Sequence, residues 1–193
     1  MLAAAAEVIA ERGVAATRIS DVAERCGVSP PAVLYWFDSK ERLLAEALIA
    51  DDARFYEELS ARLATAGTPR DRLSILLATA AEDSPDFALW MELWTWSLRD
   101  ESLRRARERF DSRWREEIAA IVVAGQRAGE FGDIDAARAA LAIGALIDGL
   151  TVQVALGDPE VDRDGLLETA AEFAGRLLET ELDVGKVGDP ASA

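Results

Sequence analysis

The sequence predicts an all-α fold, and three observations support this prediction. Half of the 193 residues are hydrophobic, and alanine and leucine recur along the whole chain. Glycine and proline, with 13 and 6 copies, are few and scattered, so helices can form between them. Apolar residues also return every three or four positions, which is the spacing of one helical face. We therefore expect helices joined by short loops.

The first 27 residues predict two helices. Apolar residues share one face over residues 2–12, and Gly13 follows, where a left-handed residue can end a helix. Thr17 is expected to cap a second helix, which stops at Gly27.

A third short helix is expected to start after Ser29. Ser29 suits an N-cap, and Pro30 and Pro31 occupy first-turn positions, whose amides have no partner inside a helix. Two short helices joined by the turn Cys26–Ser29 are typical of a helix-turn-helix, which places its second helix in the major groove of DNA. A helical hairpin inside a core has the same periodicity, so the pattern alone leaves both interpretations open.

The rest of the chain predicts longer helices. Asp38 and Glu41 form a capping-box pattern that opens a helix ending near Leu63. Further helices are expected at residues 69–82, 85–98, 101–128, 134–156 and 162–182, and a disordered tail at 184–193.

The charge is unevenly distributed. The net charge is −15, but residues 1–50 hold five Lys and Arg against seven Asp and Glu, a net of −2. Residues 51–193 carry the remaining −13. Phosphate binding depends largely on Lys and Arg, so the N-terminal segment must bind DNA with few, well-placed cations and backbone amides.

Other classes of protein have less support. Cys26 is the single cysteine, which rules out an intramolecular disulfide, and the first residues lack a basic signal region, so we expect a cytoplasmic protein. Arg138 and Asp148 interrupt the longest apolar stretch, residues 136–156, so no membrane span is expected. Without histidine there is no Glu-x-x-His motif and no Ser–His pair. An enzyme, such as a helical hydrolase or a di-metal protein, therefore has little support, and we expect no cofactor or metal site.

The N-terminal residues resemble the signature of TetR-family regulators. The match rests on residues 17–23 (TRISDVA), 26–29 (CGVS), 35–41 (YWFDSKE) and 43–44 (LL). The resemblance implies a three-helix DNA-binding domain at residues 1–46 and a helical domain for ligand sensing and dimerisation at 47–183.

The resemblance also implies roles for individual residues. The recognition helix corresponds to residues 29–36, and phosphate contacts to Thr17, Tyr35 and Lys40. Base reading falls to Pro30, Pro31, Ala32 and Leu34, which offer apolar contacts such as those to thymine methyl groups, with Arg18 as a polar reader and specificity resting partly on DNA shape. Ser29 and Trp36 complete the DNA-binding set, although core packing is the alternative for Trp36 and the preferred role of Phe37. Leu34 and Trp36 depart from the Tyr, and from the His or Tyr, that the family usually has, and the usual basic N-terminal arm is missing or very short.

Four of the five tryptophans lie within residues 90–114. Trp90 and Trp94 are four residues apart on one helical face, and Trp114 from the next helix is expected to meet them around a cavity for an apolar or cationic molecule. A plain aromatic core is the alternative. This half resembles the C-terminal domain of BetI-type TetR regulators, which include choline-responsive repressors. The expected ligand-binding residues are Phe87, Trp90, Met91, Trp94, Trp114, Asp148 and Gln153, with Glu92 nearby.

The last two long helices carry apolar stripes that suit a homodimer, although core packing within the chain accounts for part of each. The resemblance implies a repressor that binds double-stranded, palindromic operator DNA and is released by a small-molecule effector. The alternative is a ligand-binding or scaffold protein that retains the fold without binding an operator.

Overall fold

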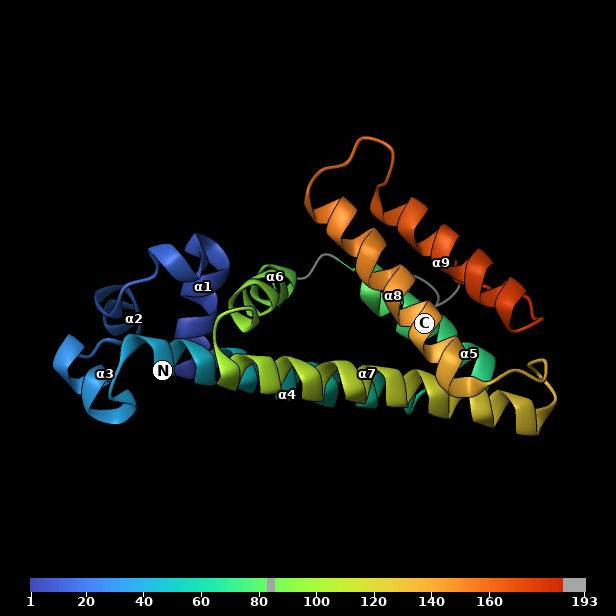
Figure 1. Ribbon diagram of the computed structural model, residues 1–193, viewed down its shortest axis with the longest axis horizontal. Coiled ribbons are helices and arrows are strands. Elements are labelled where there is room, and N and C mark those ends of the chain that lie inside the picture. Colours follow the sequence, from blue (N-terminus) through green and yellow to red (C-terminus); the bar gives the residue numbers. More distant parts are fainter. Residues whose placement is uncertain (83–85, 186–193) are drawn as a thin grey trace. The chain divides into compact units, whose positions relative to one another are not determined.

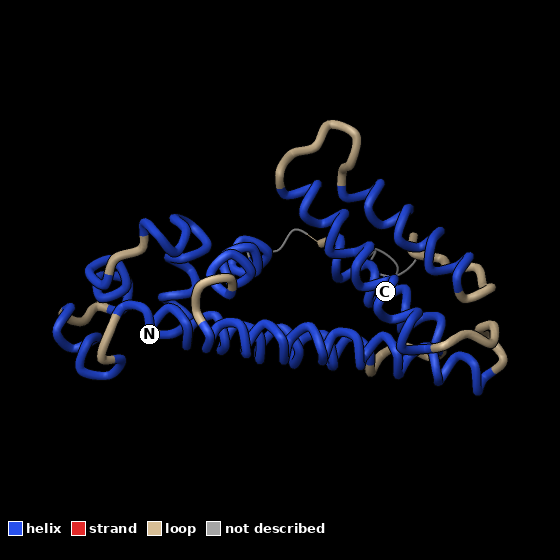
Figure 2. The backbone as a smooth tube through the Cα atoms, in the orientation of Figure 1, coloured by secondary structure: helices blue, strands red, loops and turns tan. Residues whose placement is uncertain are grey.

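The computed structural model describes residues 1–82 and 86–185, without the side chains of residues 51, 52, 86–89 and 102. All regular structure in these residues is helical, which confirms the predicted fold class (Figures 1 and 2). The helices are α1 (Leu2–Ala16), α2 (Ile19–Cys26), α3 (Pro30–Phe37), α4 (Lys40–Leu63), α5 (Pro69–Ala81), α6 (Asp86–Ser97), α7 (Glu101–Ala128), α8 (Ala136–Ala155) and α9 (Arg163–Leu177).

The chain forms two compact units. The first comprises Met1–Glu57 and Ser84–Phe110, and the second comprises Glu58–Asp83 and Asp111–Ala193. Helix α4 runs without a break through residues 46 and 47, where we expected the domain boundary, and α6 belongs to the same unit as the first three helices.

The first unit packs α1 against α2 and α6, and α2 against α3. Its core is mainly aliphatic, with Phe37 from α3, and α6 and α7 contribute one leucine each. The buried residues include Ala5, Ile9, Val14, Val22, Val33, Leu43, Leu44, Leu93 and Leu103. This core fixes the side of α3 that faces inward, and so leaves the other side to solvent.

The second unit is formed by the end of α4 from Glu58, by α5, by α7 from Asp111 onward, and by α8 and α9. Helix α9 packs against both α5 and α8. Its buried side chains include Leu73, Leu76, Leu77, Ile118, Ile121, Ile143 and Leu166.

Two predicted helix ends differ from the structure at the N-terminal side. Helix α1 does not stop at Gly13 but kinks there, with φ 74° and ψ 159°, and continues to Ala16. The prediction that Thr17 caps α2 is wrong, because the N-cap is Arg18, whose backbone N–H donates to Asp21 Oδ2 at 3.0 Å. The Thr17 hydroxyl instead donates backwards to the Gly13 carbonyl at 2.8 Å.

Two further ends differ. Asp38 closes α3, with a positive φ of 60°, and Ser39 opens α4 by accepting the backbone N–H of Arg42 at 3.1 Å. The last helix ends at Leu177 rather than near residue 182. Glu179 has a φ of 54°, which turns the chain out of the helix. The predicted tail at 184–193 lies largely outside the described residues.

Helix α8 is unusually apolar for its position. Among the described helices, it alone is long and apolar enough to cross a membrane by length and composition, and only 28% of that stretch is buried within the chain. The sequence analysis expected no membrane span in this same segment, because Arg138 and Asp148 interrupt it. A helix of this kind needs a covering surface, either lipid or protein.

Candidate functional site

Helix α3 is held by a tight turn and a defined N-terminus. Gly27 adopts the left-handed conformation, with φ 67° and ψ 29°, and reverses the chain after α2. Ser29 caps α3 by accepting the backbone N–H of Ala32, as predicted. Val33 and Phe37 bury one side of the helix in the core of the first unit. The turn and the core together fix which side chains α3 presents outward.

The outward face of α3 is aromatic and aliphatic. Tyr35, Trp36 and Leu34 are 81%, 66% and 41% exposed. The Tyr35 and Trp36 rings touch edge to face, with centroids 5.7 Å apart. Core packing of Trp36 is therefore contradicted, whereas core packing of Phe37 is confirmed. Large aromatic side chains exposed in this way on a short helix need a partner surface.

Ion pairs engage most of the cations near α3. Arg25 bridges Glu7 and Glu11 of α1 at 2.8 and 2.7 Å, and its hydrogen bond to Glu11 lowers the pKa of that carboxyl. Arg12 pairs with Asp21 at 3.2 Å.

A second ion-pair cluster lies at the start of α4. Arg42 binds Asp38 at 2.9 Å and Glu46 at 2.8 Å. Arg18 and Lys40 are then the two cations of residues 1–50 for which the described residues provide no carboxylate partner. These two are the cations of the helix-turn-helix that remain available to phosphate.

The structure removes one predicted phosphate contact. The Thr17 side chain has no exposed surface, and its hydroxyl is engaged with the Gly13 carbonyl. A phosphate contact through that hydroxyl is therefore contradicted. Ser29, Pro30 and Pro31 are exposed at the start of α3, and Ala32 is half-buried behind them.

Five aromatic residues of α4, α6 and α7 form one cluster in the first unit. Trp90 and Trp94 lie on α6 with ring centroids 6.0 Å apart, and Trp90 stands edge-on against Phe110 of α7. Phe55 and Tyr56 of α4 complete the cluster at Phe110. The sequence analysis predicted neither residue as part of the aromatic site. Two adjacent aromatic residues on one helix were the signal that could have indicated them.

One polar atom in this cluster has no partner among the described residues. The indole N–H of Trp94 is buried, and the described residues offer it no acceptor. A buried donor without an acceptor carries a free-energy cost, so such an atom points to a bound molecule or water. Met91 and Glu92 are half-buried on the same helix, while the side chain of Phe87 lies outside the described residues.

The remaining predicted ligand residues lie in the second unit. Trp114 of α7 is buried against α8, where a Cβ on Gly144 would lie 3.6 Å from its ring. Gln153 is exposed. A meeting of Trp114 with Trp90 and Trp94 would join the two units, and it stays a prediction.

Asp148 is half-buried on α8 and faces charged groups of α7. Its pKa is raised to about 6, first by burial and then by the carboxylate of Asp111, while the guanidinium of Arg115 acts in the opposite direction. A carboxylate held in this way gains from a nearby cation, because a cation restores the charged form.

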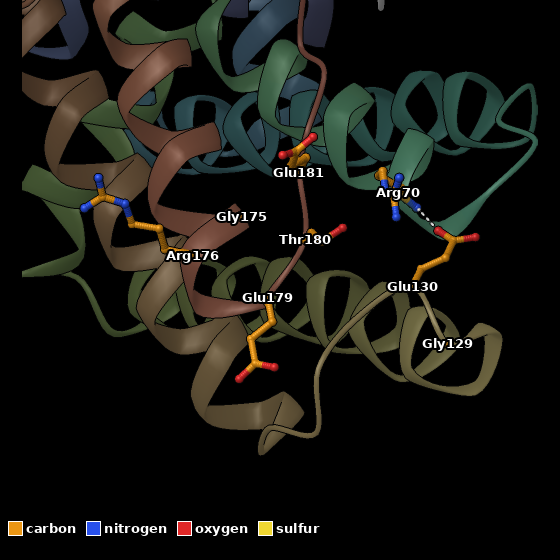
Figure 3. A pocket seen from close by; sticks show the side chains of 8 residues that line it. All are labelled: Arg70, Gly129, Glu130, Gly175, Arg176, Glu179, Thr180 and Glu181. Carbon is orange, nitrogen blue, oxygen red and sulfur yellow. Dashed lines mark hydrogen bonds between the residues drawn. The ribbon is translucent and has the colours of Figure 1, made fainter.

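A separate hollow of about 560 Å³ opens in the second unit (Figure 3). It lies between the start of α5, the turn after α7 and the end of α9, and the Arg70 backbone N–H donates to Glu130 across it at 3.0 Å. Its lining is Arg70, Gly129, Glu130, Gly175, Arg176, Glu179, Thr180 and Glu181. None of the predicted ligand residues lines it.

A short helix that follows a tight turn and exposes one face to solvent is the arrangement of a helix-turn-helix DNA-binding protein. The model of bacterial regulatory proteins of the tetR family matches residues 1–47, and that of the BetI-type transcriptional repressor C-terminal domain matches residues 69–179. The chain belongs to the TetR family of transcriptional regulators, with a C-terminal domain of the BetI type.

Individual relatives agree with this assignment. The chain is 29% identical over 191 residues to the HTH-type transcriptional regulator BetI of Rhizobium meliloti, covering 97% of this chain and 91% of the relative. A transcriptional regulator from Saccharomonospora viridis, solved in complex with choline, shares the fold with a TM-score of 0.86 and 30% identity, over 92% of this chain and 94% of that one. FadR from Bacillus subtilis, solved with stearoyl-CoA, shares the fold at a TM-score of 0.72 and 22% identity, over 90% and 95% of the two chains.

Proposed function

We propose that this transcriptional repressor binds a palindromic operator as a homodimer and that a small organic cation of the choline type releases it. The observation that carries the proposal is the exposed face of α3, where Tyr35 and Trp36 stand in solvent on a helix mounted by a helix-turn-helix. The family consists of transcriptional regulators rather than enzymes. A cytoplasmic location follows from this role.

The proposed DNA contacts divide into two groups. Tyr35, Lys40 and Arg18 bind phosphate, because a phenol, an ammonium and a guanidinium all donate hydrogen bonds to phosphate oxygens. Ser29, Pro30, Pro31, Ala32, Leu34 and Trp36 face the bases or the groove wall. Phosphate contacts set the register of the helix, and the second group supplies sequence preference.

The proposed dimer interface is the outer surface of α8 and α9. Leu141 on α8 and Phe173 on α9 are 57% and 38% exposed, although α8 and α9 pack against each other. Ala145 and Gly149 are exposed on α8 and are small enough to permit close approach of another helix. A second copy would cover this surface and place two α3 helices for successive major grooves, roughly 34–36 Å apart.

The proposed effector site uses the aromatic cluster of α6. Indole faces attract organic cations, and Trp90 and Trp94 lie on the helix that packs against α1 of the DNA-binding domain. The relative from Saccharomonospora viridis was solved with choline, which supports a ligand of this class. For the effector to act, its affinity must differ between the DNA-bound and released states, typically by about 1–3 kcal/mol of coupling.

Footprinting of the promoter region next to the gene tests the proposal. The purified full chain, at two salt concentrations, is expected to protect a palindrome, and added choline is expected to weaken the protection. Protection that choline leaves unchanged would remove choline as the effector. No protection at low salt would favour the ligand-binding or scaffold alternative.

A further inference from the structure

We propose that the hollow between the start of α5, the turn after α7 and the end of α9 is a second small-molecule site, which takes a dibasic amino acid such as lysine. All of its lining residues belong to the second unit, and none of them belongs to the aromatic cluster of α6. Its volume of about 560 Å³ lies in the range of small-molecule sites. The proposal does not depend on operator binding or on a choline-type effector, because it uses none of their residues.

A buried hydroxyl group faces the hollow. Thr180 Oγ1 is buried, and the described residues give it no hydrogen-bond partner. It points toward the side of the hollow where Arg70 and Glu130 lie (Figure 3). The Arg70, Glu179 and Glu181 side chains around it are exposed, so they can shift to admit a ligand. A buried hydroxyl without a partner carries a free-energy cost, which a ligand that bonds to it would remove.

The backbone holds Thr180 in this position. Glu179 has a φ of 54°, which folds the chain back onto α9, and the Thr180 N–H donates to the Gly175 carbonyl at 2.9 Å. The Thr180 carbonyl oxygen lies 2.8 Å from where a Cβ of Gly175 would be, so this close approach depends on glycine. The hydroxyl is therefore fixed by the fold.

The opposite wall is also fixed. The Arg70 backbone N–H donates to Glu130 Oε2 at 3.0 Å, and the Glu130 N–H donates to the Gly125 carbonyl at 2.9 Å. The start of α5 thus engages the Glu130 carboxylate. The described residues provide no carboxylate partner for the Arg70 guanidinium, which is exposed at the hollow.

The charges of the hollow match a cation that also carries a carboxylate. Arg176 is already paired with Glu172 of the same helix. One guanidinium, on Arg70, and two carboxylates, on Glu179 and Glu181, then remain for a ligand. Helices α7 and α9 also end here, and helix C-termini favour cations. A ligand with one carboxylate and two cationic groups complements this set.

The placement of the carboxylates favours an extended cation over a metal ion. Glu179 and Glu181 point to opposite sides of Thr180 (Figure 3). In the described part of the chain, no three Asp, Glu, His or Cys side chains form a group that could hold a metal ion. Ammonium groups can donate to the two separate carboxylates, and Arg70 can bind an α-carboxylate through two parallel hydrogen bonds. A diamine has no carboxylate and would meet Arg70 with a like charge.

An NMR titration tests the proposal. The ¹⁵N-labelled full chain is titrated with L-lysine at constant ionic strength. The amide signals of Gly129, Gly175 and Thr180 are expected to shift with a dissociation constant on the order of 1 mM, because the charged groups of the site are exposed. Cadaverine lacks the carboxylate of lysine, and norleucine lacks its side-chain ammonium, so each should bind about fivefold more weakly. Unchanged signals under a large excess of lysine, or equal binding of the three compounds, would overturn the proposal.

Three variants assign the binding to the hollow. Arg70→Gln should abolish the preference for lysine over cadaverine. Thr180→Val should weaken lysine binding about threefold and also raise the melting temperature of the free protein, because it removes a buried hydroxyl without a partner. Arg127→Gln, at an exposed arginine of α7 outside the hollow, should bind lysine normally. A preference for lysine that survives Arg70→Gln would place the ligand elsewhere and overturn the proposal.

Discussion

Gly13 and Glu92 are in contact across α1 and α6: a Cβ atom on residue 13 would lie 2.8 Å from Glu92 Oε1. Gly13 also holds a φ of 74°, which side-chain-bearing residues rarely adopt. The helix that carries Trp90 and Trp94 therefore touches the DNA-binding domain at a position where the backbone conformation requires glycine.

Gly13→Ala is expected to destabilise the protein by about 2 kcal/mol, because φ 74° with ψ 159° is a backbone conformation essentially confined to glycine. Gly27→Ala is the comparison, since φ 67° with ψ 29° is the left-handed helical conformation, which alanine adopts at a cost of about 1 kcal/mol. Urea unfolding of both variants measures the difference. Glu92→Ala should restore little of the loss in Gly13→Ala, because the Glu92 carboxylate lies at the end of a flexible side chain and can move aside. Full restoration by Glu92→Ala would mean that the cost is steric.

Operator affinity should depend only moderately on salt. With Arg18 and Lys40 as phosphate contacts in each subunit, four counterions are released, which predicts a slope of log K against log salt of about −3.6. Lys40→Gln should reduce that slope by about 1.8. Arg42→Gln should leave it unchanged, because Arg42 is already paired with Asp38 and Glu46. A larger slope for the wild type would mean that the ion pairs open on DNA.

Asp148 should make stability depend on pH. Its pKa is about 6 in the folded chain and near 3.8 when unfolded, so the folded state binds more protons in that interval and stability falls as pH rises through it. Above pH 6 the charged carboxylate costs about 2 kcal/mol, because solvent at its exposed side screens part of the about 3 kcal/mol that the two pKa values imply. Asp148→Asn should therefore be more stable than wild type at pH 7.5, with the advantage gone near pH 4. Urea titrations from pH 4 to 8 check this, and a pH-independent difference would contradict the cause.

Choline binding should depend on the charge of the ligand and on Trp94. Tryptophan fluorescence titration is expected to show binding of choline but not of its neutral analogue 3,3-dimethylbutanol, because only the cation is attracted to the indole faces. Trp94→Ala should weaken choline binding about tenfold or more, within the range of a desolvated cation–π contact. Leu98→Ala should bind choline normally. Equal binding of the two ligands would exclude a cation site.

Leu141→Arg should convert the dimer to a monomer, because the charge would be buried without a partner in the proposed interface. Light scattering after gel filtration measures the mass. Leu98→Arg, at another exposed leucine, is the control and should stay dimeric. A monomeric wild type would remove the interface and leave the apolar surface of α8 to a membrane or another protein.

Local sequence signals predicted α3 well. Gly27, Ser29 and the two prolines determine the turn and the start of α3 by backbone conformation alone, and α7 was placed correctly from its periodicity. Thr17 was misjudged because its hydroxyl has a closer partner behind it, in the Gly13 carbonyl, than ahead.

Tertiary contacts explain what the sequence could not predict. Residues 178–182 are compatible with helix, but the chain leaves α9 at Leu178, and the Thr180 carbonyl oxygen lies only 2.8 Å from where a Cβ of Gly175 would be. The aromatic cluster around Phe110 brings together residues more than fifty positions apart in sequence, and no periodicity predicts such a meeting. The sequence left open whether Trp36 is buried. In the structure its neighbour Phe37 points into the core, and Trp36 is exposed.

The bridge from Arg25 to Glu7 and Glu11 has a consequence for how the repressor finds its target in the cell. Sliding along a chromosome depends on sequence-independent attraction to phosphate. With three of its five N-terminal cations neutralised and a net charge of −15, this chain would dissociate quickly from random DNA. Its search would proceed mainly by free diffusion, and little of its population would be sequestered on the rest of the genome.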